Sequence, residues 1–313
     1  MIRQLTEASQ LDCGCLKTNR YGRWIYTYLR AYGVGYDFCR FFRIEGAGTG
    51  YALLFNATLT IYMDPTKEDL TELAREIQMF IAMHQPFRVE TTANLMQYLM
   101  QTEGYHPLHR TVFELTSTGL PEDFDEYEID FAPRLDDAYD ILREGFPHLI
   151  AHDLWLTDVS HRLRRGVSKV FTYKNSTTAT ILYDVDNEVL IAQVATRAAA
   201  RGSGYARQFL RWLAGFLEQF GKHAVLMALD IRVSFYTEIG FRPLETEYVL
   251  ERTEHDPEAM QKGEQRTGHG FRTQKCAAPE HPPHPAPGHI PYPGSLCQCP
   301  RIRSRYCRKS KAH

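Results

Sequence analysis

Two glycines and an arginine stand where the chain changes from an apolar strand pattern to a long amphipathic helix pattern. Gly202 and Gly204 lie two positions apart, and Arg201 precedes them. Glycines allow a tight backbone turn and a close approach by a ligand. The first N–H groups of a helix have no partner within the helix, and they bind phosphate oxygens well. We therefore expect this segment to bind a pyrophosphate, with Arg201 adding positive charge.

This segment has other interpretations. A dinucleotide-binding fingerprint would need a third glycine where Arg207 stands, and a P-loop would need Gly-Lys followed by Ser or Thr, which is absent. The sequence therefore disfavours both the dinucleotide-binding fingerprint and the P-loop. A tight turn that binds nothing remains open on this segment alone.

A second candidate is the phenol of Tyr236, within an aromatic segment that ends at Gly240 and Phe241. In one interpretation these aromatics belong to the core of a short helix, and Gly240 is its C-cap. In the other, the phenol lies in a cleft and donates a proton to a leaving group. The segment alone does not decide between them.

These residues need a strand before the glycines and a helix after them, and the hydrophobic pattern predicts both. Residues 189–196 are predicted to form a mostly apolar strand, and a helix is expected from near Ser203 until Gly221 stops it. Its apolar positions follow helical spacing: Phe209, Leu210, Leu213, Phe216, Leu217 and Phe220. The other elements expected here are strands at 127–131, 168–173, 177–183, 224–229 and 240–250, helices at 136–144 and 154–165, a short helix up to Glu238, and a hairpin turn at 174–176.

The chain also contains an internal similarity. Gly104-Tyr105-His106-Pro107-Leu108 matches Gly240-Phe241-Arg242-Pro243-Leu244 at an offset of 136. At the same offset, a helical pattern at 70–80 falls on 206–216, and an apolar segment at 51–62 falls on 187–198. We infer two copies of one fold, with chance similarity as the alternative. The domains expected are 1–116, 125–252, and a disordered, basic, Pro/His-rich tail at 253–313.

Together these motifs resemble the GNAT (acyl-CoA N-acyltransferase) superfamily. Arg201, Gly204 and Ala206 fill the pattern Gln/Arg-x-x-Gly-x-Gly/Ala, and residues 235–241 fit a second pattern, Phe-Tyr-x-x-x-Gly-Phe. The resemblance covers about 127–251. It implies a tandem α/β (α+β) arrangement of two lobes, each with a mixed, mostly antiparallel central sheet flanked by helices.

The resemblance also implies an activity, namely transfer of an acetyl group from acetyl-CoA, as co-substrate, to a primary amine by direct attack. Tyr236 would protonate the leaving CoA thiolate. The cofactor would contact Val194, Ala195, Thr196, Arg201, Gly202, Ser203, Gly204, Tyr205 and Ala206. No general base can be assigned, since Gln193 on the strand is not one. The alternative is a non-catalytic acyl-CoA-binding or scaffold protein of the same fold.

The first copy is expected to be degenerate. At the offset of 136, Gly202 and Gly204 fall on Thr66 and Glu68, and Tyr236 falls on Met100. A carboxylate favours a helix N-terminus but repels phosphate. We therefore expect the first copy to bind no CoA and to form a wall of the acceptor cleft.

Charge and cysteine content indicate the setting. The formal net charge is -2, but the residues from 256 onward carry +6, so the rest carries -8. That favours a cationic or amine-bearing acceptor, either small or on a peptide or protein. A signal peptide and a membrane span are both missing from the sequence pattern, and the seven cysteines are interpreted as free thiols, so a cytoplasmic protein is expected.

The tail offers two further hypotheses. Its cysteines, including Cys297 and Cys299, match no common zinc spacing, and no metal is expected. Its arginines and lysines could contact nucleic acid, but a solvated tail is the preferred interpretation and nucleic acid is not expected as a partner. The acceptor itself stays open among small amines, aminoglycoside-like cations, peptide N-termini and protein lysines.

Overall fold

The structure is a computed structural model that describes residues 1–253, except 47, 65–68, 117–118, 120–123 and 148. The hypotheses about the tail lie outside the described residues. Among those described, no helix combines the length and the apolar character that crossing a membrane requires.

The first half of the chain contains six strands, three helices and short 3₁₀ turns within the described residues. The strands are β1 Ile2–Gln4, β2 Cys39–Gly46, β3 Gly48–Phe55, β4 Thr58–Met63, β5 Arg88–Thr91 and β6 Tyr105–Leu115. The helices are α1 Arg20–Tyr32, α2 Thr71–His84 and α3 Ala93–Leu99.

The second half follows the elements expected from its sequence pattern. Its strands are β7 Ile129–Asp130, β8 Lys169–Tyr173, β9 Thr177–Val185, β10 Glu188–Thr196, β11 His223–Leu229 and β12 Arg242–Arg252. Its helices are α4 Leu135–Gly145, α5 His152–Arg164, α6 Tyr205–Glu218 and α7 Val233–Ile239. The hairpin at 174–176 is confirmed, because Lys174 and Asn175 have φ of 50° and 48°. Such positive φ values suit a tight two-residue turn.

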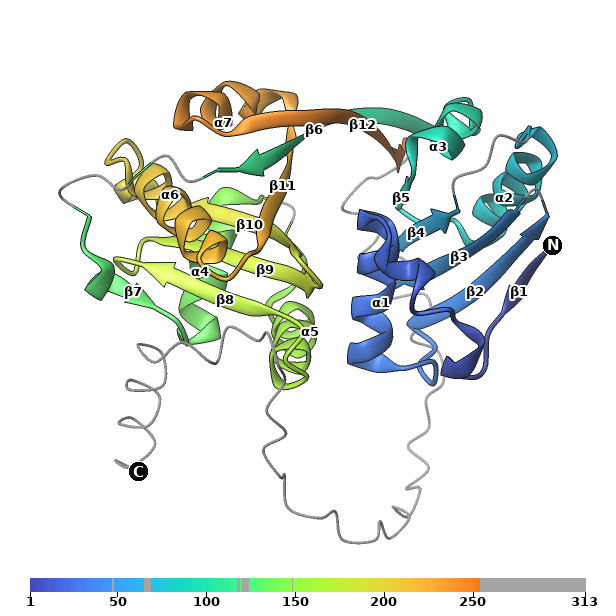
Figure 1. Cartoon of the computed structure of the whole chain (residues 1–313), viewed down its shortest axis with the longest axis horizontal. Helices are drawn as coiled ribbons and strands as arrows, with labels where there is room; N and C mark the ends of the chain where they lie inside the picture. The colour runs from blue at the N-terminus through green and yellow to red at the C-terminus, as the bar shows by residue number, and fades with distance from the viewer. Residues whose placement is uncertain (47, 65–68, 117–118, 120–123, 148, 254–313) are drawn as a thin grey trace, which may run out of the picture. The chain divides into compact units, whose positions relative to one another are not determined.

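The twelve strands of the described residues form one mixed, mostly antiparallel sheet in the order β1-β2-β3-β4-β5-β12-β6-β11-β10-β9-β8-β7 (Figure 1). The last strand of each half is exchanged: β12 pairs with β5, β6 pairs with β11, and β6 and β12 pair with each other. The predicted sheet class is confirmed. The division into 1–116 and 125–252 stays a prediction, since in space the last strand of each segment pairs with the other.

In the first half, the sheet is buried on both faces, and side chains alternate between two cores. On β3, Tyr51 and Leu53 join α1, whereas Ala52 and Leu54 join α2 and α3. Because successive side chains of a strand point to opposite faces, this burial explains the continuous apolar run in the sequence. Leu250 of the exchanged β12 belongs to the same core as α2.

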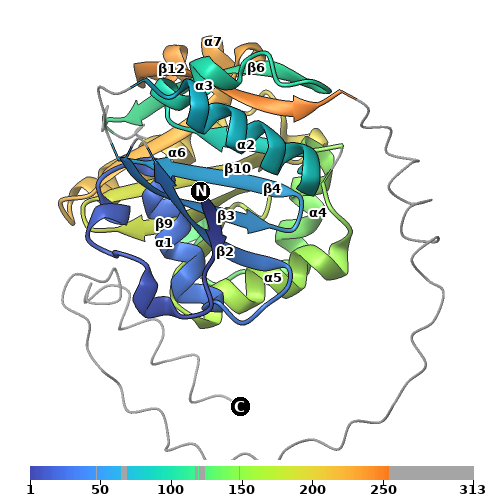
Figure 2. The same ribbon diagram turned by 90° about the vertical axis from the view of Figure 1, so that its right-hand side faces the viewer.

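The second half is also layered. Helices α4 and α5 pack on one face, where Trp155 joins Val170 and Ala195. Helix α6 covers the other face with aromatic contacts, and the rings of Phe209 and Tyr173 stack with their centroids 5.9 Å apart. Figure 2 shows α4 and α5 together on one side of the strands of this half.

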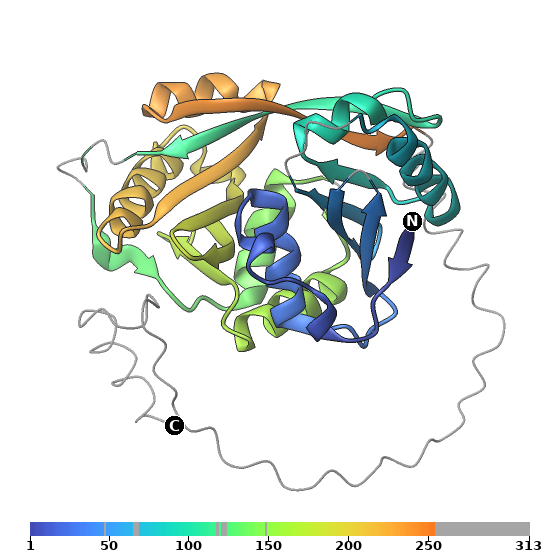
Figure 3. The ribbon, with the colours of Figure 1, turned by 45° about the vertical axis from the view of Figure 1, so that its right-hand side comes forward.

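Helix α1 links the two halves (Figure 3). The Arg23 guanidinium lies 2.9 Å from the Glu188 carboxylate on β10. The Tyr32 hydroxyl donates to Asp158 of α5 at 2.6 Å.

A buried charge network joins the exchanged strands. The side chain of Arg110 on β6, which is 8% exposed, bridges Glu90 on β5 and Glu247 on β12. A buried carboxylate needs such a partner, because leaving it unpaired would cost much free energy. The network therefore ties β5, β12 and β6 together.

The internal repeat is present, but its offset is not constant. The parallel pairing of β4 with β5 begins at Thr58, and the equivalent pairing of β10 with β11 begins at Glu188. The constant offset of 136 would instead place Thr58 on Val194. The helices α2 and α6 begin at Thr71 and Tyr205, whereas the constant offset would place Thr71 on Arg207. The apolar segment 51–62 contains most of two strands, β3 and β4, joined by a turn. A single offset therefore misaligned the two halves at this point.

Candidate functional site

Strand β10 separates from β11 partway along its length. The two strands pair from Glu188 to Ile191, and beyond Ile191 only the β9 edge of β10 has a partner strand among the described residues. The register with β9 is interrupted between Ala192 and Ala195. Such a bulge bends a strand and redirects its side chains. The β11-facing edge of residues 194–196 therefore has no partner strand among the described residues.

The segment after β10 turns through both glycines, as the sequence predicts. Gly202 and Gly204 have φ of +83° and +76°, and no atom lies within 4 Å of a Cβ built on either. L-residues rarely adopt this conformation, so these positions need glycine for its backbone freedom. Gly204 is the N-cap of α6 and offers no side chain to cap it.

The start of α6 therefore presents its own N–H groups. The first intrahelical bond runs from the Gln208 N–H to the Gly204 carbonyl, so the amides of Tyr205, Ala206 and Arg207 have no partner within the helix. The Lys174 ammonium lies 4.9 Å from the ring centroid of Tyr205, which brings a further positive charge close to the helix start. These features fit a phosphate group.

The side chain of Arg201 is engaged with the protein itself. Its guanidinium donates to the carbonyl oxygens of Thr196, at 3.3 Å, and Glu144. It therefore ties the loop to the ends of β10 and α4. From the sequence, we interpreted Arg201 as a positive charge for the ligand. These hydrogen bonds also give its side chain a structural role.

Glu144, at the end of α4, holds the other side of the loop. Its carboxylate accepts a hydrogen bond from the Ala198 N–H and lies 3.3 Å from the Arg197 guanidinium. Both contacts lower the pKa of Glu144, and the hydrogen bond from Ala198 has the larger effect. A Cβ on Gly145 would lie 2.8 Å from the Ala195 Cβ, so glycine there allows α4 to approach β10 closely.

Tyr236 lies on α7 and packs on β6, the strand next to β11. Its ring centroid is 5.5 Å from that of Phe113 on β6, and Phe113 pairs directly with Leu226, the last β11 residue that also pairs with β10. Burial raises the pKa of Tyr236 to about 12. The phenol therefore stays protonated at neutral pH and can act as a proton donor.

The predicted site residues thus come from consecutive elements of the second half. Val194, Ala195 and Thr196 lie at the end of β10, residues 201–206 span the loop and the first turn of α6, and Tyr236 follows β11 on α7. The Thr196 hydroxyl is 2.9 Å from that of Thr177, which places its side chain toward β9.

The sequence did not indicate the contact of Glu144 with the loop or the backbone conformation of Gln193. Glu144 is far from Ala198 in the chain, and a glutamate near a helix end carries no signal of such a contact. Gln193 adopts a left-handed φ of +52° inside β10, and glutamine is not a residue that marks a bulge. Neither position had a signal in a single sequence.

Among its described residues, the first half lacks these features where they would be equivalent. The residue before α2 is Leu70, with φ of -93°, and the Asp69 carboxylate accepts a hydrogen bond from the Thr71 N–H at 3.0 Å. Strand β4 pairs with β3 without a register shift.

The equivalent of Tyr236 also differs from the sequence match. The fourth residue of α3, which corresponds to Tyr236 on α7, is the buried Met96. The match of Tyr236 to Met100 is therefore displaced by about one helical turn along the chain. The matches to Thr66 and Glu68 lie outside the described residues.

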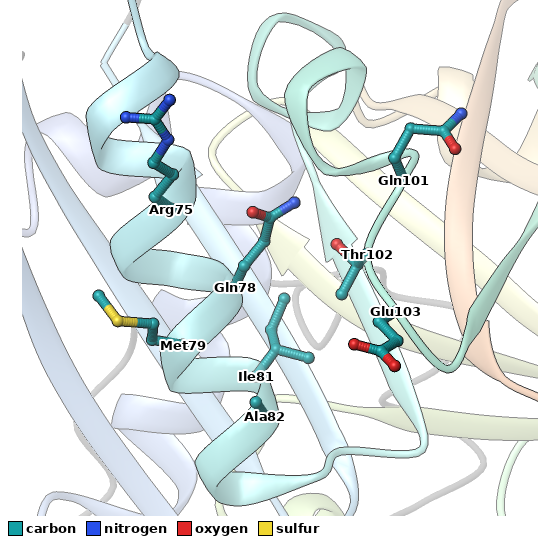
Figure 4. A pocket seen from close by; sticks show the side chains of 8 residues that line it. All are labelled: Arg75, Gln78, Met79, Ile81, Ala82, Gln101, Thr102 and Glu103. Atoms are coloured by element: carbon teal, nitrogen blue, oxygen red, sulfur yellow. The ribbon is translucent and has the colours of Figure 1, made fainter.

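A hollow in the first half lies between α2 and the segment after α3, with a volume of about 430 Å³ (Figure 4). It is lined by Arg75, Gln78, Met79, Ile81, Ala82, Gln101, Thr102 and Glu103. Its arginine already pairs with Glu72, and the Thr102 hydroxyl donates to the Leu99 carbonyl. Both of these polar groups therefore already have a partner within the protein.

Solved structures share this architecture. A GCN5-related N-acetyltransferase from Sphaerobacter thermophilus is 19% identical, with a TM-score of 0.51, over 80% of this chain and 94% of the other. A tandem GNAT protein from the clavulanic acid biosynthesis pathway is 10% identical, with a TM-score of 0.53, over 82% and 99%. A Drosophila protein has a TM-score of 0.56 at 11% identity, again over 82% and 99%.

These similarities establish the fold. The chain has the GNAT fold in a tandem arrangement, as its motifs led us to expect. No model of a known protein family matches the sequence. No curated protein matches it either.

Proposed function

We propose that the protein is an N-acetyltransferase that moves an acetyl group from acetyl-CoA to a primary amine. The observation that carries this proposal is the joint geometry of β10, the glycine loop and α7. An unpaired strand edge, a helix start without a capping side chain and a protonated phenol come from consecutive elements of the second half. In the proposal, residues 202–206 bind the pyrophosphate and residues 194–196 hold the pantetheine arm.

The bound thioester supplies the reactive carbonyl carbon. The amine attacks it directly, so that a C–N bond forms and the C–S bond breaks. Tyr236 gives its proton to the sulfur and regains one from solvent. The attacking nitrogen, which is positively charged once the C–N bond has formed, loses its proton to water. The protein's contribution is to position the reactants and to donate hydrogen bonds where negative charge develops. An amine acceptor and a cytoplasmic setting belong to the same proposal.

The test is acetyl-CoA binding, measured by calorimetry for the wild type and Gly204→Glu. The substitution forces an L-residue into a left-handed conformation and places a carboxylate where the phosphates would bind. We expect at least about a 100-fold increase in the Kd, which corresponds to about 2.7 kcal/mol.

The matched control is Gly221→Glu, just after the other end of α6. Gly221 has φ of +67°, and no atom lies within 4 Å of an added Cβ, so strain and charge are matched. Its Kd should equal that of the wild type. If the wild type binds no acetyl-CoA, the proposal fails, and a scaffold of GNAT fold becomes the better account.

A further inference from the structure

Gln193 has a conformation that the rest of the sheet avoids. It lies in the bulge of β10: Ala192 pairs with Thr180 and Ala195 with Thr178, so Gln193 and Val194 together oppose a single residue. Its φ is +52°. The other described non-glycine residues with positive φ all lie outside strands, in turns or just after a helix. Strain of this kind tends to accumulate at functional sites.

The side-chain oxygen of Gln193 also lacks a hydrogen-bond partner among the described residues. This atom, Oε1, is buried. Buried polar atoms in folded proteins nearly always have partners, and an exception calls for an explanation. A ligand that brings an N–H group to this oxygen would provide one.

The order of residues along the chain indicates which part of a ligand reaches Gln193. In the proposed function, the pyrophosphate lies at residues 202–206 and the pantetheine arm follows residues 194–196 backward along β10. Gln193 comes next in that direction, close to Ile191, where the pairing with β11 ends. It therefore lies at the acyl end of the arm and not at the phosphate end.

We propose that Gln193 orients the acceptor amine. Its Oε1 accepts a hydrogen bond from one N–H of the amine, which leaves the nitrogen lone pair directed at the thioester carbon. An amide oxygen is too weak a base to remove a proton, so Gln193 acts by positioning and the amine loses its proton to water. This inference rests on the proposed acetyl transfer and names a contact on its acceptor side.

The test compares the wild type with Gln193→Met and Gln193→Glu. Methionine keeps the length and the unbranched shape but removes the oxygen, whereas glutamate keeps an acceptor oxygen. The probes are spermidine, kanamycin, a peptide with a free N-terminus and a lysine peptide with a blocked N-terminus. For the amine that the wild type acetylates, Gln193→Met should lower kcat/KM by about 5- to 150-fold, the range of one hydrogen bond to a buried group.

The Kd for acetyl-CoA should change less than about twofold in Gln193→Met, and Gln193→Glu should recover part of the lost kcat/KM. A raised Kd with unchanged amine kinetics would assign Gln193 to the cofactor arm and overturn the inference. An unchanged kcat/KM in Gln193→Met would overturn it as well.

A second measurement does not depend on activity. In the ligand-free protein, Gln193→Met should have a Tm equal to or above that of the wild type, because it removes an unpartnered buried oxygen. A lower Tm would show that the amide has a structural partner and would refute the inference. Failure of the wild type to bind acetyl-CoA would instead refute the proposed function, so the two failures are distinguishable.

Discussion

Helices α2 and α6 occupy equivalent places in the two halves, yet they begin differently. Helix α2 follows Leu70, and the Asp69 carboxylate already occupies its first N–H. Helix α6 follows the left-handed Gly204 and leaves its first N–H groups without a capping side chain. An internal carboxylate satisfies the positive end of one helix, whereas no side chain caps the other.

The strands before these helices differ in the same sense. Strand β4 runs without interruption beside β3, whereas β10 has the bulge at Gln193. The buried Met96 stands where the second half has Tyr236. The shared fold thus preserves the sheet and helices in both halves, while the two halves differ in a few residues at the ends of elements.

The largest expected effect comes from Tyr236→Phe. Loss of the proton donor should lower kcat by about 100- to 1,000-fold while the Kd for acetyl-CoA stays within about twofold. Steady-state kinetics and calorimetry measure the two quantities. The matched variant in the first half is Tyr98→Phe on α3, which should leave kcat unchanged. Equal losses in both variants would contradict the asymmetry.

The pH dependence follows from the same phenol. Burial raises the pKa of Tyr236 to about 12, so the proton-donating form persists at every pH below that value. The kcat of the wild type should therefore show no loss assignable to Tyr236 between about pH 7 and pH 10. A falling limb in that range that vanishes in Tyr236→Phe would show that the phenol ionises far more easily.

A smaller effect is expected from Phe113→Leu, which tests whether the first half shapes the site. Phe113 belongs to the exchanged β6, is fully buried and packs on the Tyr236 ring. A shorter side chain should let the phenol move, lowering kcat by about tenfold and the free energy of unfolding by about 1–2 kcal/mol. Kinetics and urea denaturation report these separately. A loss of stability with full kcat would limit Phe113 to packing.

Glu144→Gln should affect the loop more mildly. The amide can still accept from the Ala198 N–H, but it loses the charge that attracts Arg197. We expect the Kd for acetyl-CoA to rise about three- to tenfold. Asp140→Asn on the same helix is the control, because Asp140 pairs with Arg143 and not with the loop. An increase of the same size in the control would indicate a general charge effect.

The smallest effect on binding is expected from Asp69→Ala, which should leave the Kd unchanged and lower the Tm by a few degrees. Hydrogen bonds from the Thr71 hydroxyl and N–H lower the pKa of Asp69. A lowered pKa means that the carboxylate stabilises the fold above its unfolded pKa near 4, and that this contribution is lost as the pH falls. The Tm difference should therefore shrink as the pH falls below about 4. A changed Kd would give the first half a part in binding.

Local elements were predictable because their signals are local. The turn at Lys174 and Asn175, the start of α6 near Ser203 and the order of elements in the second half all follow from neighbouring residues. Periodicity shows which face of a strand is buried, but it does not identify the partner strand. The exchange of β6 and β12 was therefore not predictable from the pattern, although their glycine-aromatic starts revealed the repeat.

The site was predictable to the same extent. Gly202 and Gly204 indicated their left-handed conformations because few other residues tolerate them. The engagement of Arg201 with Glu144 and Thr196 depends on how α4 packs against β10, which no local motif encodes. The left-handed Gln193 arises from the register of neighbouring strands and was equally unpredictable.

The exchanged strands have a consequence for how the chain matures during synthesis. Strand β5 pairs with β4 and β12, and β12 is made only after all the other strands of the sheet. During synthesis, one edge of β5 stays unpaired until β12 has been made. Strand β6 has no partner strand until β11 and β12 have been made. Unpaired strand edges invite misassembly, and contacts so distant in sequence form slowly. We therefore expect this protein to depend most on protection from aggregation while its first half has been made and β11 and β12 have not.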